Sequence, residues 1–261
     1  MSSLPTPGPE TSSASLLENA PALSEGQRLI NVFVAPSKTF TDLKRKASWI
    51  NWFIPWLAVA IMTWIFVGVV AQKVGFRQVN ENAMRMNAKM QERIAQMPTE
   101  QREQMLERST KFTEGRLLIH PGFVLLGYVI VAAVLMGTFN FGMGAETSFG
   151  TSLAIVAYAN LPRILKLLLA AVSLFAGADP GSFLFENPLA CNLSFLVDFS
   201  SHPVLYALAD SFDIFAIWTI VLLGIGFSCV SKVKRSTAIG VVFGWYALAT
   251  LVGLGFVAIF A

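Results

Sequence analysis

Long runs of apolar residues dominate the chain. A helix needs roughly 20 residues to cross about 30 Å of hydrocarbon. Five such segments lie at residues 49–70, 123–143, 148–176, 204–230 and 238–260. Because backbone polar groups in a bilayer must be satisfied within the segment itself, each run favours a helix. The pattern predicts an all-α integral membrane protein with a five-transmembrane-helix bundle, in which residues 121–260 hold the second to fifth spans.

The third apolar segment is longer than a bilayer requires. As one helix, residues 148–176 would extend about 43 Å. Pro162 lies near its middle, where it lacks an N–H group and kinks a helix. One tilted helix kinked at Pro162 is the favoured interpretation, and two half-helices meeting at Asn160-Leu161-Pro162 are the alternative.

Residues 71–120 are charged and show helical periodicity. Apolar residues recur three or four positions apart until Pro98, after which Thr99 and Glu100 are typical of a new helix start. The pattern predicts an extramembrane helical hairpin between the first and second spans. Its apolar side includes a group that we call the methionine stripe: Met86, Met90, Ile94 and Met97. Flexible Met side chains suit a partner-binding surface, but the stripe would equally hold the two helices together or against the bilayer.

Two segments precede the first span. Residues 1–24 are rich in Ser, Pro, Thr and Ala, which predicts a disordered tail without the pattern of a signal peptide. Residues 25–48 are amphipathic, with Pro36 suited to a helix start. We expect them to form an interfacial segment at headgroup level.

Composition supports a membrane protein. Hydrophobic residues make up 54% of the chain and charged residues 13%, against roughly 25% charge in a soluble domain. The net charge is only +3, with no dense basic face. The expected surroundings are therefore a lipid bilayer, with no nucleic-acid partner.

The basic residues that flank the spans predict orientation. Two groups should face the cytoplasm under the positive-inside rule. They are Lys38, Lys44, Arg45 and Lys46 before the first span, and Lys232, Lys234 and Arg235 between the fourth and fifth. The N-terminus should then be cytoplasmic and the C-terminus outside, with residues 71–120 and 177–203 also outside.

Charged residues inside the predicted spans form a candidate polar cluster. Arg163 and Lys166 lie three apart in the third span, and Asp210 and Asp213 lie three apart in the fourth. Charges at such depth are costly and usually face partners. Lys166 and Asp213 lie at similar distances from the outer ends of their helices, so we expect an ion pair that fixes the packing of the two spans. Exchanging the two charges should then restore folding that either reversal alone disrupts.

Other polar and small residues predict helix contacts. Asn160, which belongs to the candidate cluster, and Asn140 suit hydrogen bonds between helices. Gly240 and Gly244 form a Gly-x-x-x-Gly pattern that permits close helix approach. We expect this pattern to serve packing within the chain, and a homo-oligomer is the alternative.

No catalytic pattern is apparent in the sequence. The two histidines and two cysteines lack metal-ligand or nucleophile spacing. We therefore expect a protein that is not an enzyme, has no cofactor or metal, and leaves Cys191 and Cys229 unpaired.

Several short motifs in order resemble the Yip family, five-span membrane proteins named for interaction with Ypt/Rab GTPases. The motifs are Val32–Phe40, Trp52–Trp56, Tyr158–Pro162, and Asp213–Trp218 followed by Gly226, Lys232 and Ala238. The resemblance implies a five-helix bundle with the N-terminus inside and the C-terminus outside. Eukaryotic members act in endoplasmic-reticulum and Golgi traffic and have a long cytosolic N-terminal region with an Asp-Leu-Tyr-Gly-Pro element, which this chain lacks. The charged insertion between the first two spans is similar to the bacterial branch, which favours a bacterial inner membrane over the endoplasmic reticulum or Golgi.

Two functions follow as hypotheses. The first is a membrane scaffold or accessory factor that binds a protein partner through the hairpin or the cytoplasmic face. The second is a transport subunit or small-solute transporter that uses the charges near Pro162. A polar cavity that reaches Arg163 would favour transport, and a closed bundle would favour the scaffold.

Overall fold

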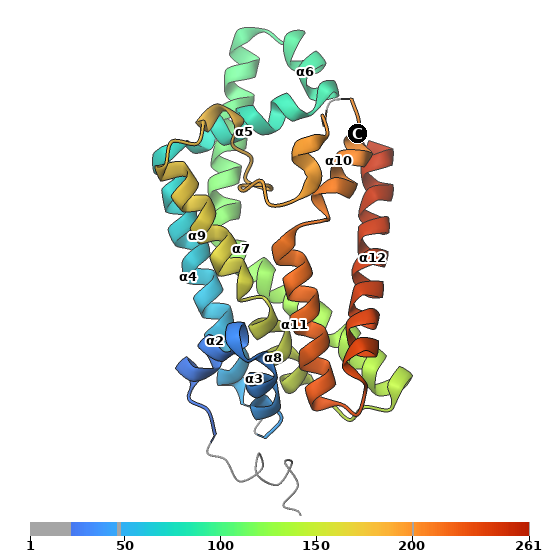
Figure 1. Ribbon diagram of the computed structural model, residues 1–261. Helices are drawn as coiled ribbons and strands as arrows, with labels where there is room; N and C mark the ends of the chain where they lie inside the picture. The colour runs from blue at the N-terminus through green and yellow to red at the C-terminus, as the bar shows by residue number, and fades with distance from the viewer. Residues whose placement is uncertain (1–21, 46–47, 200, 261) are drawn as a thin grey trace, which may run out of the picture.

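The computed structural model describes residues 22–45, 48–199 and 201–260, and in these residues the regular secondary structure is helical (Figure 1). The α-helices are α2 (Glu25–Val34), α3 (Pro36–Leu43), α4 (Trp49–Lys73), α5 (Phe76–Met86), α6 (Ala88–Ala95), α7 (Thr99–Met143), α8 (Phe149–Ala159), α9 (Pro162–Phe175), α10 (Pro203–Asp210), α11 (Ile214–Val230) and α12 (Arg235–Phe260). Two short 3₁₀ helices, η1 (Pro180–Ser182) and η2 (Leu193–Leu196), lie in the connection between α9 and α10. The predicted tail falls almost entirely outside the described residues.

The spans are helical and apolar, as predicted. Four helical stretches are long and apolar enough to cross a bilayer: α4, α7, α8 with α9, and α12. The predicted fourth span differs, because α10 and α11 are bent by 49° at a break. The count of five therefore requires α10 and α11 together to be one broken span. The all-α membrane class is confirmed.

One helix joins the second span to the predicted hairpin. At about 1.5 Å per residue, the 45 residues of α7 extend about 68 Å, far beyond the thickness of a bilayer. α7 begins at Thr99, as predicted, and continues through Pro121 to Met143. The first arm is not one helix, because Asn87 is extended and its side chain caps α6. We call α5, α6, the first part of α7 and the described residues 177–199 and 201–203 the head.

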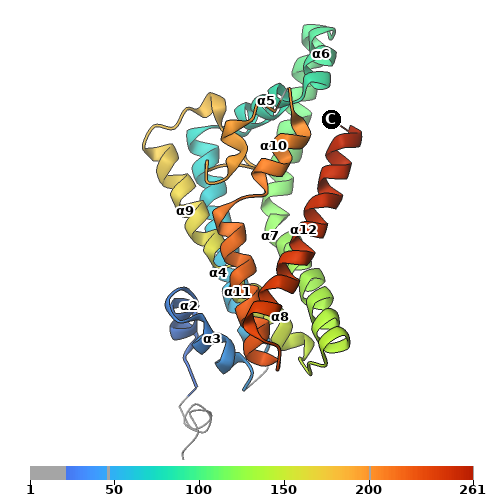
Figure 2. The ribbon, with the colours of Figure 1, turned by 45° about the vertical axis from the view of Figure 1, so that its right-hand side comes forward.

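The head is held together by polar contacts between segments that are distant in sequence. Arg77 of α5 forms a salt bridge with Glu103 of α7, with 2.9 Å between Nη2 and Oε2. The buried Asn82 donates hydrogen bonds to the carbonyl oxygens of Pro180 and Phe183. These contacts attach α5 both to α7 and to the connection after α9. In Figure 2, α6 and the start of α7 project beyond α5 and the connection after α9.

The third span is one span with an interrupted backbone. α8 ends at Ala159 and α9 begins at Pro162, while the two together form a single candidate span. Pro162 occupies the first turn of α9, where its missing N–H group costs nothing. The segment is therefore one candidate span, as favoured, but it consists of two helices that meet at residues 160 and 161, as in the alternative, and not of one helix kinked at Pro162.

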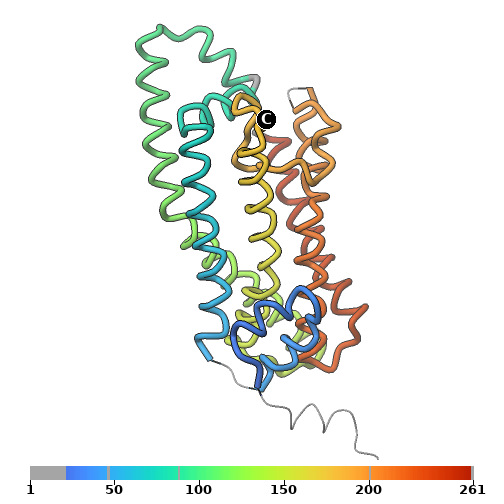
Figure 3. The backbone as a smooth tube through the Cα atoms, turned by 60° about the vertical axis from the view of Figure 1, so that its left-hand side comes forward, coloured from blue at the N-terminus to red at the C-terminus, as the bar shows by residue number. Residues whose placement is uncertain are grey.

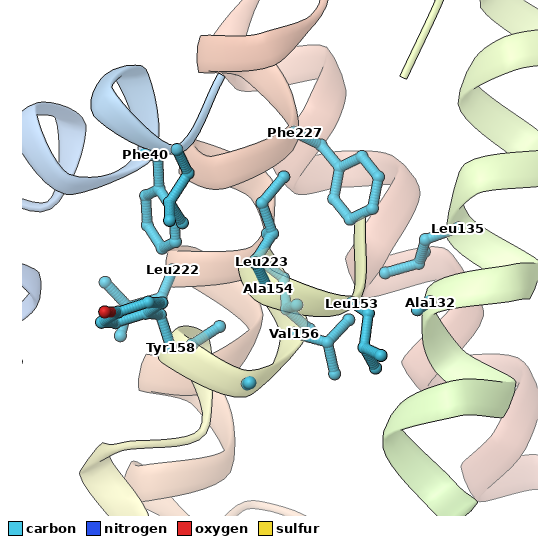
Figure 4. Close-up of a cluster of buried hydrophobic side chains, with 14 of the residues drawn as sticks. Phe40, Ala132, Leu135, Leu153, Ala154, Val156, Tyr158, Leu222, Leu223 and Phe227 are labelled. Carbon is cyan, nitrogen blue, oxygen red and sulfur yellow. The ribbon is translucent and has the colours of Figure 1, made fainter. Parts of the chain in front are cut away.

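α8 forms the centre of the bundle. Every residue from Thr151 to Ala159 is buried, which fits a helix that is apolar on all sides. Figure 4 shows side chains of α8 between those of α7 and α11. Phe139 of α7 stacks on Phe227 of α11, with ring centroids 4.6 Å apart.

The segment predicted to be interfacial packs against the bundle. Val32, Phe40 and Leu43 are fully buried, and α3 contacts α11 and α8. In Figure 3, α2 and α3 (blue) lie across one end of the bundle, opposite the head. We call this end, together with residues 231–234, the base. Figure 1 marks the C-terminus at the head, so the two ends of the described chain lie at opposite ends of the bundle.

Glycine permits close packing in α11, but not at the predicted pattern in α12. A Cβ atom on Gly224 would lie 2.6 Å from Ile239 Cα, and one on Gly226 would lie 2.4 Å from Ile155 Cγ2. At Gly240 and Gly244 a Cβ atom would meet nothing within 4 Å. The expectation that these two residues serve packing within the chain was therefore wrong. The small face of α11 serves this purpose instead.

Candidate functional site

The predicted polar cluster lies where the two interrupted spans meet. Lys166 of α9 and Asp213, before α11, form a salt bridge with 2.8 Å between Nζ and Oδ2. The side chain of Asp213 is 9% exposed and that of Lys166 is 21% exposed. The expected contact between these two residues is present, and it joins the third span to the broken fourth.

Asp213 has a second structural role that the sequence interpretation missed. Its Oδ1 accepts hydrogen bonds from the backbone N–H groups of Phe215 and Ala216, so it caps the N-terminus of α11. Asp210 ends α10 instead, and thus the two aspartates do not lie on one continuous helix. An Asp immediately before an apolar run is a typical N-cap signal. That signal was available in the sequence and indicates the break.

Cys191 reaches the same carboxylate from the connection between α9 and α10. Its Sγ donates to Asp213 Oδ2 at 2.8 Å. Burial, and then the hydrogen bond to Asp213, raise the pKa of the Cys191 thiol to about 12. Both effects disfavour the thiolate, so the thiol is protonated and poorly nucleophilic at neutral pH. Cys191 and Cys229 are unpaired.

The other members of the cluster have different partners. Asp210 Oδ1 accepts a hydrogen bond from Asn192 at 2.9 Å. Arg163 Nη2 lies 3.4 Å from His120 Nε2 of α7, and its buried Nε has no hydrogen-bond partner among the described residues. Asn160 donates to the carbonyl oxygen of Val156 in its own span at 2.8 Å, so this hydrogen bond is not the expected contact between helices.

A cavity of about 800 Å³ connects these residues. Its polar wall contains all five residues of the predicted cluster: Asn160, Arg163, Lys166, Asp210 and Asp213. The remaining walls are mainly apolar side chains of α7, α11 and α12. On α12 the small residues Ala249 and Gly253 line it one turn apart, which leaves room beside the helix. The volume is within the range of small-molecule sites.

The cavity is not sealed. Ile130 of α7 lines it and is 55% exposed, and Trp245 of α12 lines it and is 41% exposed. α7 and α12 are joined near the base by a hydrogen bond from Trp245 Nε1 to Thr138 Oγ1. Closer to the head, their exposed apolar side chains border the cavity. The opening therefore faces the region that a bilayer would occupy.

The remaining predicted site residues lie elsewhere. Arg235 donates a hydrogen bond to Ser37 at 3.0 Å, so the two basic groups are at the same end of the molecule, the base. Lys38, Lys44, Arg45, Lys232 and Lys234 belong to these groups, whereas Lys46 lies outside the described residues. The methionine stripe is in the head, where its four side chains are partly exposed.

A buried polar network in the base was not predicted. Arg28 of α2 is 7% exposed and donates to Asp42 Oδ2 at 2.8 Å and to Asn51 Oδ1 at 3.0 Å. It also pairs with Glu25, whose other oxygen accepts a hydrogen bond from Tyr158 Oη of α8 at 2.8 Å. The only available signal was the opposite charge of Arg28 and Asp42 on two short amphipathic helices. The network attaches α2 and α3 to α4 and α8.

Neither the cavity nor the base network suggests a resident metal. Within residues 22–45, 48–199 and 201–260, no group of three or more His, Cys, Asp or Glu side chains could hold a metal ion.

Comparison with known proteins places this architecture in a family. No curated protein and no solved structure matches the chain. A family model described as Yip1 domain matches residues 30–257, a range that includes both interrupted spans and the whole cavity. This match covers most of the chain and confirms the resemblance seen in the motifs. The chain therefore belongs to the Yip family, as a multi-pass membrane protein with a Yip1 domain.

Proposed function

We propose that the protein is a non-enzymatic membrane protein that binds a small amphipathic molecule in the intramembrane cavity, as part of a transport step. The observation that carries this proposal is the cavity that reaches Arg163, Lys166, Asp210 and Asp213. A closed bundle would have favoured the scaffold hypothesis. An apolar pocket with a few convergent polar groups is the usual form of a small-molecule site.

The charged wall supports binding rather than packing alone. Lys166 and Asp213 satisfy each other, which explains their contribution to the fold. Arg163 and Asp210 also line the cavity, and neither forms a salt bridge within the described part of the chain. Intramembrane charges of this kind typically mark the path of a substrate or ion.

A cavity-filling substitution tests this proposal. Ala249→Trp places an indole in the cavity, whereas Ala258→Trp makes the same change at an exposed position of α12 outside it. The full chain is purified in mild detergent, and molecules that remain bound are identified by native mass spectrometry. We expect a bound molecule in the wild type and in Ala258→Trp that is lost in Ala249→Trp. If Ala249→Trp retains it, the cavity is not the binding site.

The head supports a second candidate function, the binding of a protein partner. The side chains of the methionine stripe are partly exposed, and α6 projects from the molecule together with the start of α7 (Figure 2). Crosslinking in native membranes, compared between the wild type and Met90→Gln/Ile94→Gln, tests this function. If both chains capture the same proteins in the same amounts, the stripe binds none of them.

The proposed orientation has the base in the cytoplasm and the head outside, in a bacterial inner membrane. The clustering of both basic groups at the base supports this orientation under the positive-inside rule. An endoplasmic-reticulum or Golgi membrane is the alternative.

A further inference from the structure

Arg163 has an incomplete set of partners in a largely apolar cavity. Its neighbour at 3.4 Å is His120, and its Nε is buried without a hydrogen-bond partner in the described chain. An isolated cation in such surroundings is unfavourable unless an anion accompanies it. Asp213 is paired with Lys166 and caps α11, and Asp210 accepts a hydrogen bond from Asn192. Neither carboxylate of the cavity wall forms a salt bridge with Arg163. The guanidinium group is therefore available to an anion from outside the chain.

Further side chains that can donate hydrogen bonds to an anion extend from Arg163 toward the head. Burial and the nearby Arg163 and Arg116 lower the pKa of His120, so its imidazole is neutral at neutral pH and contributes an N–H donor rather than a charge. His120 follows Arg116 by one turn on the same face of α7, and both line a surface groove on that helix with Lys111. The side chain of Arg116 is 48% exposed, and its salt bridge with Glu186 is long, with 3.7 Å between Nη2 and Oε1. Arg116, His120 and Arg163 form a row from the head side of α7 to the cavity. Such a row suits the passage of a phosphate group.

The opposite walls of the cavity suit hydrocarbon chains. Val131 and Val134 of α7 and Leu254 and Val257 of α12 line it. The exposed Ile130 lies at the opening that faces the bilayer. The site thus combines a cation that lacks an anionic partner with apolar walls open to the membrane.

We propose that the cavity takes up a glycerophospholipid, with its phosphate on Arg163 and its acyl chains against α7 and α12. This inference rests on the proposed function and names the class of its ligand. A free phosphate ion would not use the apolar walls, and a neutral lipid would leave Arg163 without an anion. The row through His120 and Arg116 would guide the headgroup from the head-side leaflet.

Photocrosslinking with two matched lipids tests this inference. The full chain is placed in phosphatidylcholine nanodiscs with a trace of phosphatidylethanolamine, or of diacylglycerol, that carries the same photoactivatable acyl chain. Crosslinked residues are identified by mass spectrometry. In the wild type we expect phosphatidylethanolamine adducts on the cavity faces of α7 and α12. Arg163→Gln should lower them about tenfold, as expected for one lost charge-assisted hydrogen-bonded contact, without affecting the weaker diacylglycerol adducts.

Variants separate the phosphate site from the cavity itself. Arg163→Lys should keep most phosphatidylethanolamine adducts, and Arg93→Gln, on the exposed surface of α6, should keep all of them. The lipid inference is overturned if Arg163→Gln leaves phosphatidylethanolamine adducts unchanged, or lowers both lipids equally. If Ala249→Trp also leaves the adducts of both lipids unchanged, the proposed function itself fails.

Discussion

The salt bridge between Lys166 and Asp213 should make a measurable contribution to stability, and a double-mutant cycle can isolate it. The suitable changes are Lys166→Met, Asp213→Asn and the two combined. Asn at 213 keeps a side-chain oxygen that can accept from the N–H groups of Phe215 and Ala216. The cycle therefore removes the charges while leaving the cap of α11 in place.

The expected magnitude follows from the burial of the two groups. Breaking a fully buried ion pair costs about 3–5 kcal/mol, because it leaves one charge without compensation. Since 21% of the Lys166 side chain is exposed, we expect about 2–3 kcal/mol for each single substitution. The double variant leaves no lone charge, so it should cost no more than either single one. The resulting coupling energy, the sum of the two single effects minus the double one, is at least about 2–3 kcal/mol.

The free energy of unfolding is obtained by titrating the full chain in mixed micelles with sodium dodecyl sulfate, followed by far-ultraviolet circular dichroism. The exposed pair of Lys111 and Glu107 in the head is the matched control, and we expect its coupling to be within the error of the measurement because solvent screens the two charges. Additive effects at Lys166 and Asp213, within the error of that control, would refute the proposed stabilisation.

The exchange of the two charges has a different expected outcome from the one that the sequence alone suggested. Lys166→Asp with Asp213→Lys restores opposite charges across the contact. A lysine cannot accept the hydrogen bonds that cap α11, and loss of such a cap costs about 1 kcal/mol. The exchanged protein should therefore be more stable than either single reversal but less stable than the wild type. Full recovery would show that the cap is unimportant.

Four further predictions follow from other parts of the structure. Gly224→Ala should destabilise the protein by about 1–3 kcal/mol, because the added Cβ meets the backbone of Ile239. Gly240→Ala should change the free energy of unfolding by less than about 0.5 kcal/mol. Equal effects of the two substitutions would contradict the close approach of α11 to α12 at Gly224. Cys191 has a pKa near 12, so its rate of reaction with N-ethylmaleimide should keep rising with pH beyond the ordinary thiol pKa near 8.5. Asp213→Asn should lower the pKa of Cys191 and speed the reaction at pH 8. A plateau of the rate near pH 9 in the wild type would disprove the shift. Arg28→Met should cost about 3 kcal/mol in the same unfolding assay, because it removes the closest cationic partner of the buried Asp42 carboxylate and leaves only the longer contact with Arg45. A loss no larger than that of an exposed arginine would exclude this role. In sealed cells, an impermeant reagent should label a tag at the C-terminus but not one at the N-terminus, and equal protection of both tags would contradict an odd number of crossings.

Much of the architecture could be predicted because hydrophobic length is a local signal. The limits of α4 and α12 differ from the predicted spans by only a few residues, since the ends of long apolar runs coincide with charges or caps. The start of α7 at Thr99 likewise followed from Pro98. The contact between Lys166 and Asp213 could be predicted from depth alone, because a buried charge needs a partner.

Features that depend on tertiary packing could not be predicted in the same way. The burial of Arg28 depends on how α2 and α3 fold back onto the base, which no local periodicity specifies. The close approach at Gly224 and Gly226, rather than at Gly240 and Gly244, depends on which faces of the helices meet. Small residues permit contact but do not choose the partner helix.

The two interruptions in the spans explain why the cavity forms where it does. The third span is interrupted at residues 160 and 161, and the fourth between α10 and α11. Irregular backbone is tolerated within a membrane only where it is buried in protein or lines a cavity. Each interruption contributes to the same wall, with Asn160 and Arg163 from one and Asp210 and Asp213 from the other. A repacked, continuous fourth helix would remove the cap at Asp213 and realign α10 with α11, so the polar wall depends on the break itself. The helix breaks and the intramembrane charges are thus one feature of the sequence, and both would be needed for the cavity to bind a ligand.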